Sequence, residues 1–262
     1  MIISLKRAAK RVVPPLLWDM AEKLAAFPWR RFDTWESAAA SCTSYEDDLF
    51  NRFRVARHEL NRKNNRLVDL QGNALLWVAS MLPGTLSVTD FGGATGEFGE
   101  ALQSQRPNVV YTVVENSALV AALASRRESI GFSTAIPPEC DVFFSSSSLQ
   151  YIADPYGVFA AGLRSAHRAV VLVRNNFSER DSIRVQRSQL FHNGGGAIPP
   201  GFSNATITYP VRTVSERLLQ DMASEAGFKM IARVPERSEG LAHLDRAYSV
   251  QLVFMRTIPR QP

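Results

Sequence analysis

The stretch VTDFGGATG, residues 88–96, is the strongest indication of the fold of this chain. Its apolar start is typical of a buried strand. The glycines that follow let the backbone turn sharply and approach a ligand closely, because they carry no Cβ. A helix is expected to begin at Gly96, where its first N–H groups have no partner within the helix. The stretch therefore predicts a strand, a ligand-binding loop and a helix, in that order.

The spacing of the loop residues excludes two common nucleotide sites. A dinucleotide-binding loop of the form GxGxxG would place glycines at 92, 94 and 97, but Ala94 and Glu97 stand there. A P-loop would need a following GK[ST], which the sequence lacks. The remaining pattern, an acidic residue followed by Gly92 and Gly96, resembles motif I of class I S-adenosylmethionine (SAM) dependent methyltransferases. Ala94 stands where that motif commonly has its middle glycine.

Two acidic residues support SAM as the cofactor. SAM carries an amino-acid tail and no pyrophosphate, so Asp90 could meet its ammonium group or order the loop. Glu115 closes the apolar run 109–114, about twenty residues beyond Gly96, where a carboxylate can accept both ribose hydroxyls. The alternative for both acids is a solvated strand end or a helix cap.

Short apolar runs alternate with helical segments from residue 86 onward, which predicts a doubly wound, mostly parallel, Rossmann-like α/β sheet. The expected strands are 86–91, 109–115, 141–145 and 169–174, and the expected helices are 96–104, 117–127 and 154–165. A helix at 214–226 precedes the strands 228–234 and 249–256, which must be antiparallel because no crossover helix joins them. Earlier helices are expected at 47–60 and 67–81. We therefore divide the chain into an N-terminal helical extension or cap, 1–66, and a methyltransferase domain, 67–262, with an insertion at 177–209.

Composition limits the partners. The net charge is +5, but the arginines are scattered and no aromatic-basic pattern accompanies them, which argues against nucleic acid. Two cysteines without a CxxC pair offer neither a disulfide framework nor a zinc site, and we expect a cytoplasmic protein without a bound metal. Basic and apolar residues mix in 1–24. This segment is either a peripheral contact to the inner membrane or a lid packed on the domain.

A narrower resemblance rests on SSSLQYxxDP at residues 146–155 together with DFGGxxG at 90–96. The two motifs resemble a family of bacterial methyltransferases that is often encoded near surface-polysaccharide genes. Residues elsewhere extend the resemblance from Trp35 to Pro210: Trp35, Ala40, Ser41, Tyr45, the VVE run at 113–115, Arg174, and the RVQ of Arg184 to Gln186 where the family has RxxQ. Membership implies the methyltransferase fold and SAM. It does not supply an acceptor, because the family's substrates are largely uncharacterised.

Ligands bind at the carboxyl ends of the strands in such a sheet, and this rule sorts the candidate residues. For the cofactor we predict Asp90, Gly92, Gly93, Gly96, Glu115, Ser148, Leu149 and Gln150. For the acceptor we predict Tyr45, Tyr151, Arg174, Asn175 and Gln186.

Two residues are predicted to take part in catalysis. Arg174 would orient the acceptor, and His192 would be the general base. The alternatives are an ion pair for Arg174 and, for His192, a mere position beside the glycines 194–196. Those glycines and the PPG at 199–201 predict a mobile loop that could close over the substrate.

The leading functional hypothesis is O-methylation of a sugar or another small polar metabolite, in surface-glycan assembly by family analogy. Two alternatives stay open at this stage: an RNA methyltransferase, suggested by the basic composition, and a SAM-binding scaffold without catalysis.

Overall fold

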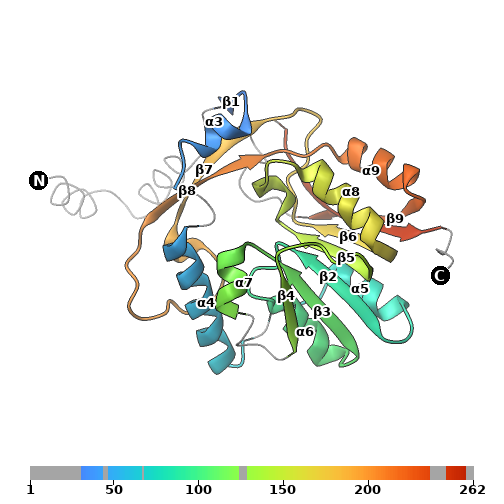
Figure 1. Ribbon diagram of the computed structural model, residues 1–262, viewed down its shortest axis with the longest axis horizontal. Coiled ribbons are helices and arrows are strands. Elements are labelled where there is room, and N and C mark those ends of the chain that lie inside the picture. The colour runs from blue at the N-terminus through green and yellow to red at the C-terminus, as the bar shows by residue number, and fades with distance from the viewer. Residues whose placement is uncertain (1–30, 44–46, 67, 124–128, 237–245, 258–262) are drawn as a thin grey trace, which may run out of the picture.

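The computed structural model describes residues 31–43, 47–66, 68–123, 129–236 and 246–257 (Figure 1). Its helices are α3 (Trp35–Ala39), α4 (Asp48–Lys63), α5 (Ala74–Met81), α6 (Glu97–Gln105), α7 (Ser117–Leu123), α8 (Pro155–Ser165) and α9 (Glu216–Glu225), with short 3-10 turns η1 (Leu149–Tyr151) and η2 (Leu190–His192). Its strands are β1 (Arg31–Phe32), β2 (Leu86–Phe91), β3 (Val109–Val114), β4 (Ile130–Ser133), β5 (Cys140–Ser146), β6 (Ala166–Val173), β7 (Ile183–Gln189), β8 (Thr206–Arg212), β9 (Phe228–Glu236) and β10 (Ser249–Arg256). The hypothesised membrane contact at 1–24 and the predicted acceptor residue Tyr45 lie outside the described residues.

The main sheet has seven strands in the order β4-β3-β2-β5-β6-β10-β9. Strands β4 to β6 of this order run parallel, while β10 is antiparallel to both β6 and β9. This sheet confirms the predicted fold class, including the antiparallel pair at the C-terminal end. The chain leaves β2 and β5 toward opposite edges of the sheet, so a crevice opens between their carboxyl ends.

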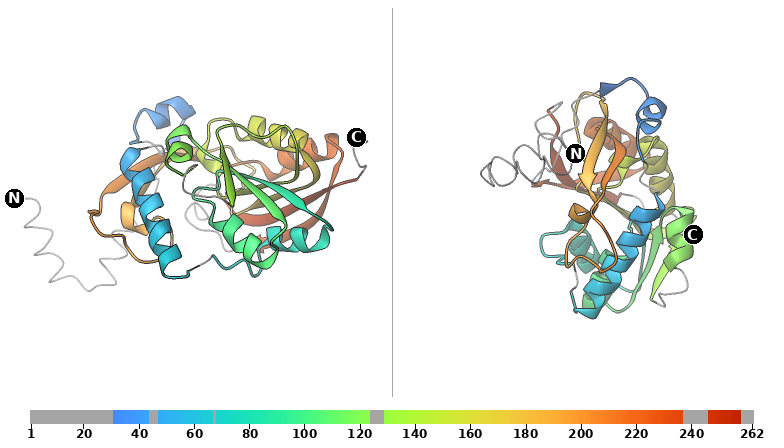
Figure 2. Two further views of the ribbon diagram at one scale, coloured as in Figure 1. Left: turned by 60° about the horizontal axis from the view of Figure 1, so that its bottom comes forward. Right: turned by 90° about the vertical axis from the view of Figure 1, so that its left-hand side faces the viewer.

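Helices cover both faces of the sheet (Figures 1 and 2). On one face, α5 and α6 bury Leu75 and Leu102 against the strands. On the other, α8 and α9 bury Phe159 and Leu219. All four side chains are fully shielded from solvent. Because each face is covered, the parallel strands are apolar on both sides, which is why they are visible in the sequence as continuous apolar runs.

In the main domain, the largest differences from the predicted elements are a later helix start and an unpredicted strand. The helix expected at 67–81 begins at Ala74, because Gly72 turns the backbone to a φ of 76° and Asn73 caps the helix through its side chain. The strand β4 was not predicted, since it has only four residues and contains Gly131. The helix expected at 117–127 is described as far as Leu123, and its predicted end lies outside the described residues.

The insertion at 177–209 is not a plain loop. It contributes β7 and most of β8, an antiparallel pair that joins β1 in a separate three-stranded sheet. We call β1, β7 and β8 the second sheet. It arches over the region beyond the carboxyl edge of the main sheet (Figures 1 and 2). The partners of β7 are β1 and β8, so local pattern could not reveal it.

Helix α4 joins the second sheet to the main domain. On one side Phe50 and Phe53 pack with Ile207 and Tyr209 of β8. On another side Val55 packs with Leu119 and Leu123 of α7. Part of the predicted N-terminal extension is thus integrated into the fold, and the side chains of α4 bridge two sheets.

Replacing Phe53 by alanine tests this integration. The Phe53 ring is fully buried, stacks on Phe191 with centroids 5.8 Å apart, and meets the edge of Phe202. We expect Phe53→Ala to lower the free energy of unfolding by about 3–5 kcal/mol, measured by urea denaturation, because a buried aromatic leaves a cavity. Met81→Ala, at a 56% exposed position, is the control and should cost less than about 0.5 kcal/mol. An unchanged midpoint for Phe53→Ala would show that α4 is only loosely attached.

Candidate active site at the carboxyl edge of the sheet

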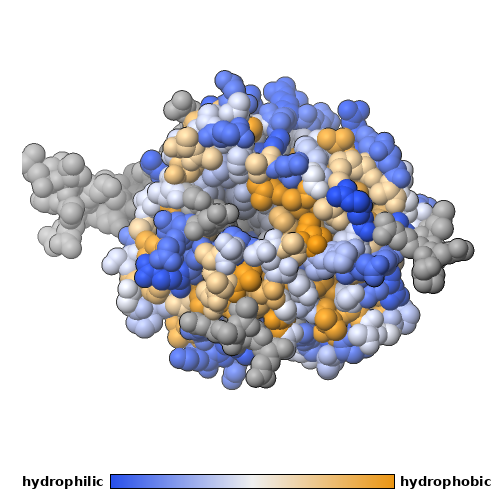
Figure 3. Space-filling view, in the orientation of Figure 1, coloured by the Kyte–Doolittle hydropathy of each residue, from blue (hydrophilic) through white to orange (hydrophobic). Residues whose placement is uncertain are grey.

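A cavity of about 910 Å³ opens at the carboxyl edge of the main sheet, bounded by the strand ends, α4 and the second sheet. Its mouth is the hollow near the centre of Figure 3. Many of the predicted site residues line it: Gly92, Gly93, Glu115, Ser148, Gln150, Tyr151, Arg174, Gln186 and His192. Strand ends that are far apart in the sequence therefore meet in one space, as the sheet topology requires.

The loop after β2 packs too tightly for side chains. A Cβ on Gly92 would lie 2.3 Å from Ser148 Oγ, and one on Gly93 would lie 2.3 Å from Asp90 Oδ2. Gly96 caps α6 with a φ of 81° and makes no side-chain capping bond. It does not line the cavity, but its left-handed conformation sets the path of the loop. Both glycines line the cavity, and the absence of side chains lets the loop pack directly against Ser148 and Asp90.

Ala94, which stands where the motif commonly has its middle glycine, adopts the backbone conformation that a glycine would have there. Its φ is 53°, in the left-handed region, and its N–H donates to Glu115 Oε1 at 3.1 Å. Two other non-glycine residues that line the cavity have a positive φ, Ser147 at 57° and Arg174 at 59°. Each of the three follows the carboxyl end of a strand, β2, β5 or β6. Such strained backbone persists where the surrounding structure enforces it, and it gathers at functional sites.

Asp90 lies beneath the loop and not in the cavity. Its side chain is fully buried, and Oδ2 accepts a hydrogen bond of 2.7 Å from the Tyr111 hydroxyl. Burial raises the pKa of Asp90 to about 7; the Tyr111 hydrogen bond acts against this shift and the nearby Glu115 charge adds to it. Of the two roles predicted for Asp90, this position favours ordering the loop over contact with a cofactor ammonium group.

Glu115 faces the cavity from the end of β3. Its Oε1 accepts from Arg54 Nη2 at 3.2 Å and from the Ala94 N–H, and its Oε2 accepts from the Asn116 N–H at 3.1 Å. The glycine loop therefore helps to orient the Glu115 carboxylate through the Ala94 N–H. Arg54 belongs to α4 and was not predicted from the sequence.

Gln150 ties the ends of β5 and β6 together. Its Nε2 donates to Ser147 Oγ at 3.0 Å, and its Oε1 accepts from the Asn176 N–H at 3.2 Å. Leu149 and Asn175, predicted to contact cofactor and acceptor, do not reach the cavity. Leu149 is fully buried in the core, and its N–H donates to Asn175 Oδ1 at 3.2 Å. Both residues lie under the cavity floor, because the turn after β5 directs the Leu149 side chain into the core.

The acceptor side is polar and aromatic. The Tyr151 hydroxyl donates to Gln186 Oε1 at 3.4 Å, and the Tyr151 ring meets Tyr209 edge to face. The Arg174 N–H donates to Glu236 Oε2 at 2.6 Å. Within the described residues, however, the Arg174 guanidinium makes no ion pair. Glu236 also lines this end of the cavity. It was not predicted as a site residue, because β9 was expected to end at residue 234.

A mobile loop was predicted from the glycines at 194–196 and the PPG at 199–201, but α4 anchors the first part of this loop, residues 191–196. Arg57 donates to the carbonyls of Phe191, Asn193 and Gly196 at 3.0, 2.8 and 2.9 Å. Asn61 donates to the Gly195 carbonyl at 3.0 Å. Arg57 is 7% exposed, and burial lowers its pKa from the usual value of arginine. The loop therefore forms a fixed wall of the cavity, and it is the wall that carries His192.

The same side of α4 also binds α6, the helix that follows the glycine loop. His58 Nδ1 lies 3.0 Å from Glu97 Oε1, and His58 Nε2 lies 3.3 Å from Glu100 Oε2. The polar residues of α4 recur at three- and four-residue spacing, as in Arg54, Arg57, His58 and Asn61, which places them along one side of a helix. That spacing was the available sequence signal for a functional α4.

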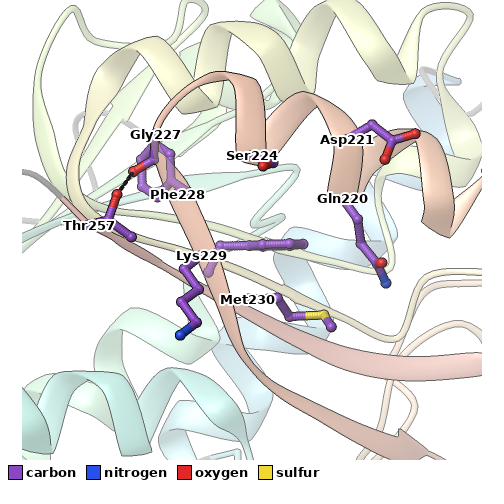
Figure 4. A pocket seen from close by; sticks show the side chains of 9 residues that line it. Gln220, Asp221, Ser224, Gly227, Phe228, Lys229, Met230 and Thr257 are labelled. Atoms are coloured by element: carbon purple, nitrogen blue, oxygen red, sulfur yellow. Dashed lines mark hydrogen bonds between the residues drawn. The ribbon is translucent and has the colours of Figure 1, made fainter.

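A second hollow, of about 420 Å³, lies between α9 and the start of β9 (Figure 4). It contains none of the predicted site residues, and Thr257 closes one side by donating to the Gly227 carbonyl. In the described part of the chain, no cluster of His, Cys, Asp and Glu is arranged to hold a metal ion. Among the described helices, none is both long and apolar enough to cross a bilayer.

No protein-family model and no curated protein matches the sequence. Solved structures of methyltransferases are similar in chain path at low identity. An amino pentose methyltransferase from Micromonospora echinaspora shares 15% identity at a TM-score of 0.48, covering 81% of this chain and 96% of that one. Magnesium protoporphyrin IX methyltransferase from Synechocystis PCC 6803 shares 14% at a TM-score of 0.49, covering 86% and 98%. The glycopeptide N-methyltransferase MtfA shares 14% at 0.47, covering 72% and 91%. At these values we draw no functional conclusion from the similarity.

The buried Asp90 predicts a pH-dependent stability. The folded pKa of about 7 exceeds the ordinary value of 3.8, so the folded state keeps its proton while the unfolded state loses it. The contribution of protonated Asp90 to the free energy of unfolding is therefore fully present below about pH 4 and is lost as the pH rises to about 7. Relative to Asp90→Asn, the wild type should lose on the order of 4 kcal/mol across this range, at about 1.4 kcal/mol per pKa unit. The check is the free energy of unfolding of both proteins from pH 4 to 8; a constant difference would contradict the assignment.

Arg57 predicts a local effect on the 191–196 loop. Arg57→Gln removes charge-assisted hydrogen bonds to three carbonyls, so amide hydrogen exchange in the loop should accelerate roughly tenfold or more. Amides of β10 in the same sample report any global loss of stability. Arg52→Gln, on the same helix with a 65% exposed side chain, should leave the loop unchanged. Equal exchange in the wild type and Arg57→Gln would mean that other contacts hold the loop.

Proposed function

We propose that this chain is a SAM-dependent methyltransferase that O-methylates a sugar or another small polar metabolite. The observation that carries the proposal is the junction of the glycine loop with Glu115. There, bare backbone at Gly92 and Gly93 and an oriented carboxylate face one cavity, and the Ala94 N–H joins the two. The junction lies at the switch point of the sheet, where ligands of open α/β folds bind.

The residues present fit SAM better than a dinucleotide. Glu115 can accept the ribose hydroxyls, and the backbone at Gly92 and Gly93 leaves room for the amino-acid tail. Ser148 and Gln150 line the next part of the cavity, beside the reactive centre in this arrangement. A pyrophosphate against the loop would lie near the Glu115 carboxylate, and the loop offers no lysine to neutralise its charge. When bound, SAM supplies a methyl group already activated on a sulfonium.

The protein's part in the reaction is to position the acceptor and to exclude water. The anchored loop at 191–196, α4 and the second sheet enclose the cavity on the side away from the main sheet. Gln186 of the second sheet, His192 of the loop, and Tyr151, which follows β5, line the cavity and can orient a hydroxyl. We assign His192 as the base that takes the hydroxyl proton, since the other histidine near the cavity, His58, is held between Glu97 and Glu100.

The acceptor class rests on the cavity. Its volume of about 910 Å³ is in the range of small-molecule sites, which are about 300–1,000 Å³, and must hold both cofactor and acceptor. A small polar molecule fits this space and its lining. A role in surface-glycan assembly rests on the family resemblance alone.

Glu115 provides the test of the cofactor site. We expect S-adenosylhomocysteine, the demethylated product, to bind the wild type with micromolar affinity in calorimetry. Glu115→Ala should weaken this by about 1–3 kcal/mol, since ribose hydroxyls lose their acceptor. The matched control is Glu139→Ala, because its side chain is 76% exposed and it does not line the cavity. A folded wild type that binds neither SAM nor S-adenosylhomocysteine would refute the proposed function.

A further inference from the structure

Among the residues that the structure describes, six charged side chains line the cavity: Arg54, Arg57, Arg174, Glu97, Glu115 and Glu236. Most of them are committed to partners within the protein. Arg54 pairs with Glu115, Arg57 binds loop carbonyls, and Glu97 pairs with His58. Apart from Glu115, which belongs to the proposed cofactor site, the charged side chains of this set without such a partner are Arg174 and Glu236.

The backbone of Arg174 is fixed while its side chain is not. Its N–H donates to Glu236 Oε2, and its carbonyl accepts from Gln150 Nε2 at 3.4 Å. These bonds hold the strained φ of 59°. The side chain is exposed at the cavity, and no residue of the described chain makes an ion pair or hydrogen bond with its guanidinium. The Arg174 backbone is held in place, and its guanidinium N–H groups are available as donors. Such an arginine can bind a carboxylate or a phosphate through two parallel hydrogen bonds.

Glu236 is held so that one oxygen remains available. It ends β9 opposite Ser249 of β10, and its Oε2 accepts from Ser249 Oγ at 3.2 Å as well as from the Arg174 N–H. Its Oε1 accepts no hydrogen bond from the described residues. Although Arg174 and Glu236 are neighbours, the contact joins backbone to carboxylate, and their opposite charges do not neutralise each other directly.

The Arg174 and Glu236 pair is separate from the ribose-binding carboxylate. Glu115 follows β3 and Arg174 follows β6, three strands along the sheet. At about 4.8 Å between strands, the two strand ends are roughly 14 Å apart. The pair therefore faces the far end of the cavity, beyond Ser148 and Gln150.

We infer that the acceptor is a small hydroxylated acid. Arg174 binds its carboxylate or phosphate group, and Glu236 Oε1 accepts a hydrogen bond from one of its hydroxyls. This inference rests on the proposed function and narrows its substrate class: a neutral sugar would leave the Arg174 guanidinium without a partner. Glu236 is a specificity-determining residue in this account, and it holds Arg174 in position through the backbone.

The test uses the full chain saturated with S-adenosylhomocysteine and three probes of similar shape: D-glucuronate, glucose 1-phosphate and glucose. We expect at least one anionic probe to bind tenfold or more tightly than glucose by calorimetry. Binding of glucuronate alone identifies a carboxylate acceptor, and binding of glucose 1-phosphate alone a phosphate ester. Equal, or absent, binding of all three probes to a protein that still binds S-adenosylhomocysteine overturns the inference and leaves the proposed function standing.

Variants assign the effect to the two residues. Arg174→Gln should abolish the preference for anions, while Arg174→Lys should keep part of it. Glu236→Gln should lower the affinity for the anionic probe at least fivefold. Arg187→Gln, an exposed arginine on β7 outside the cavity, is the control and should bind as the wild type does. All variants should keep wild-type affinity for S-adenosylhomocysteine and a wild-type melting temperature. Loss of cofactor affinity in Glu236→Gln would place this residue in the cofactor site and overturn its assignment.

Discussion

The close packing of the loop after β2 is the constraint on which the site depends. Gly92 packs against Ser148, which follows the neighbouring strand β5, and Gly93 packs against the carboxylate of Asp90, with no space for a Cβ at either position. A side chain there would push the loop away from the ends of both β2 and β5. Asp90 supports the loop at the cost of burying an ionisable group. The left-handed Ala94 then brings its N–H to Glu115 and joins the loop to the end of β3.

Helix α4 has a comparable role on the other side of the cavity. Its aromatic residues pack on the second sheet, and its polar residues bind both the 191–196 loop and the helix that follows the glycine loop. Arg54 adds a direct contact to Glu115. A single helix from the N-terminal region thus connects the proposed cofactor half of the cavity to the proposed acceptor half.

The sequence predicted the main sheet well, because its strands are buried on both faces and appear as unbroken apolar runs; β2 and β10 match their predicted bounds. It predicted the loop and Glu115 because their spacing is local. The sequence-based prediction failed for elements and side chains whose placement depends on long-range contacts. The second sheet pairs β7 with β1 across some 150 residues, and β7 itself carries polar residues. Leu149 and Asn175 were assigned to the cavity because they lie beside true lining residues, but the direction of a side chain depends on the turn. Glu236 and Arg57 could not be linked to the site before the fold was known.

The central proposal is that Glu115 binds the ribose of SAM beside the loop at 92–95. The most direct test is a crystal structure of the protein with S-adenosylhomocysteine bound. The account predicts both ribose hydroxyls within about 2.6–3.2 Å of the Glu115 carboxylate, with the Arg54 contact to Oε1 lengthened or replaced. Ligand density elsewhere, with Glu115 still bound to Arg54 and no ribose near it, would contradict the account.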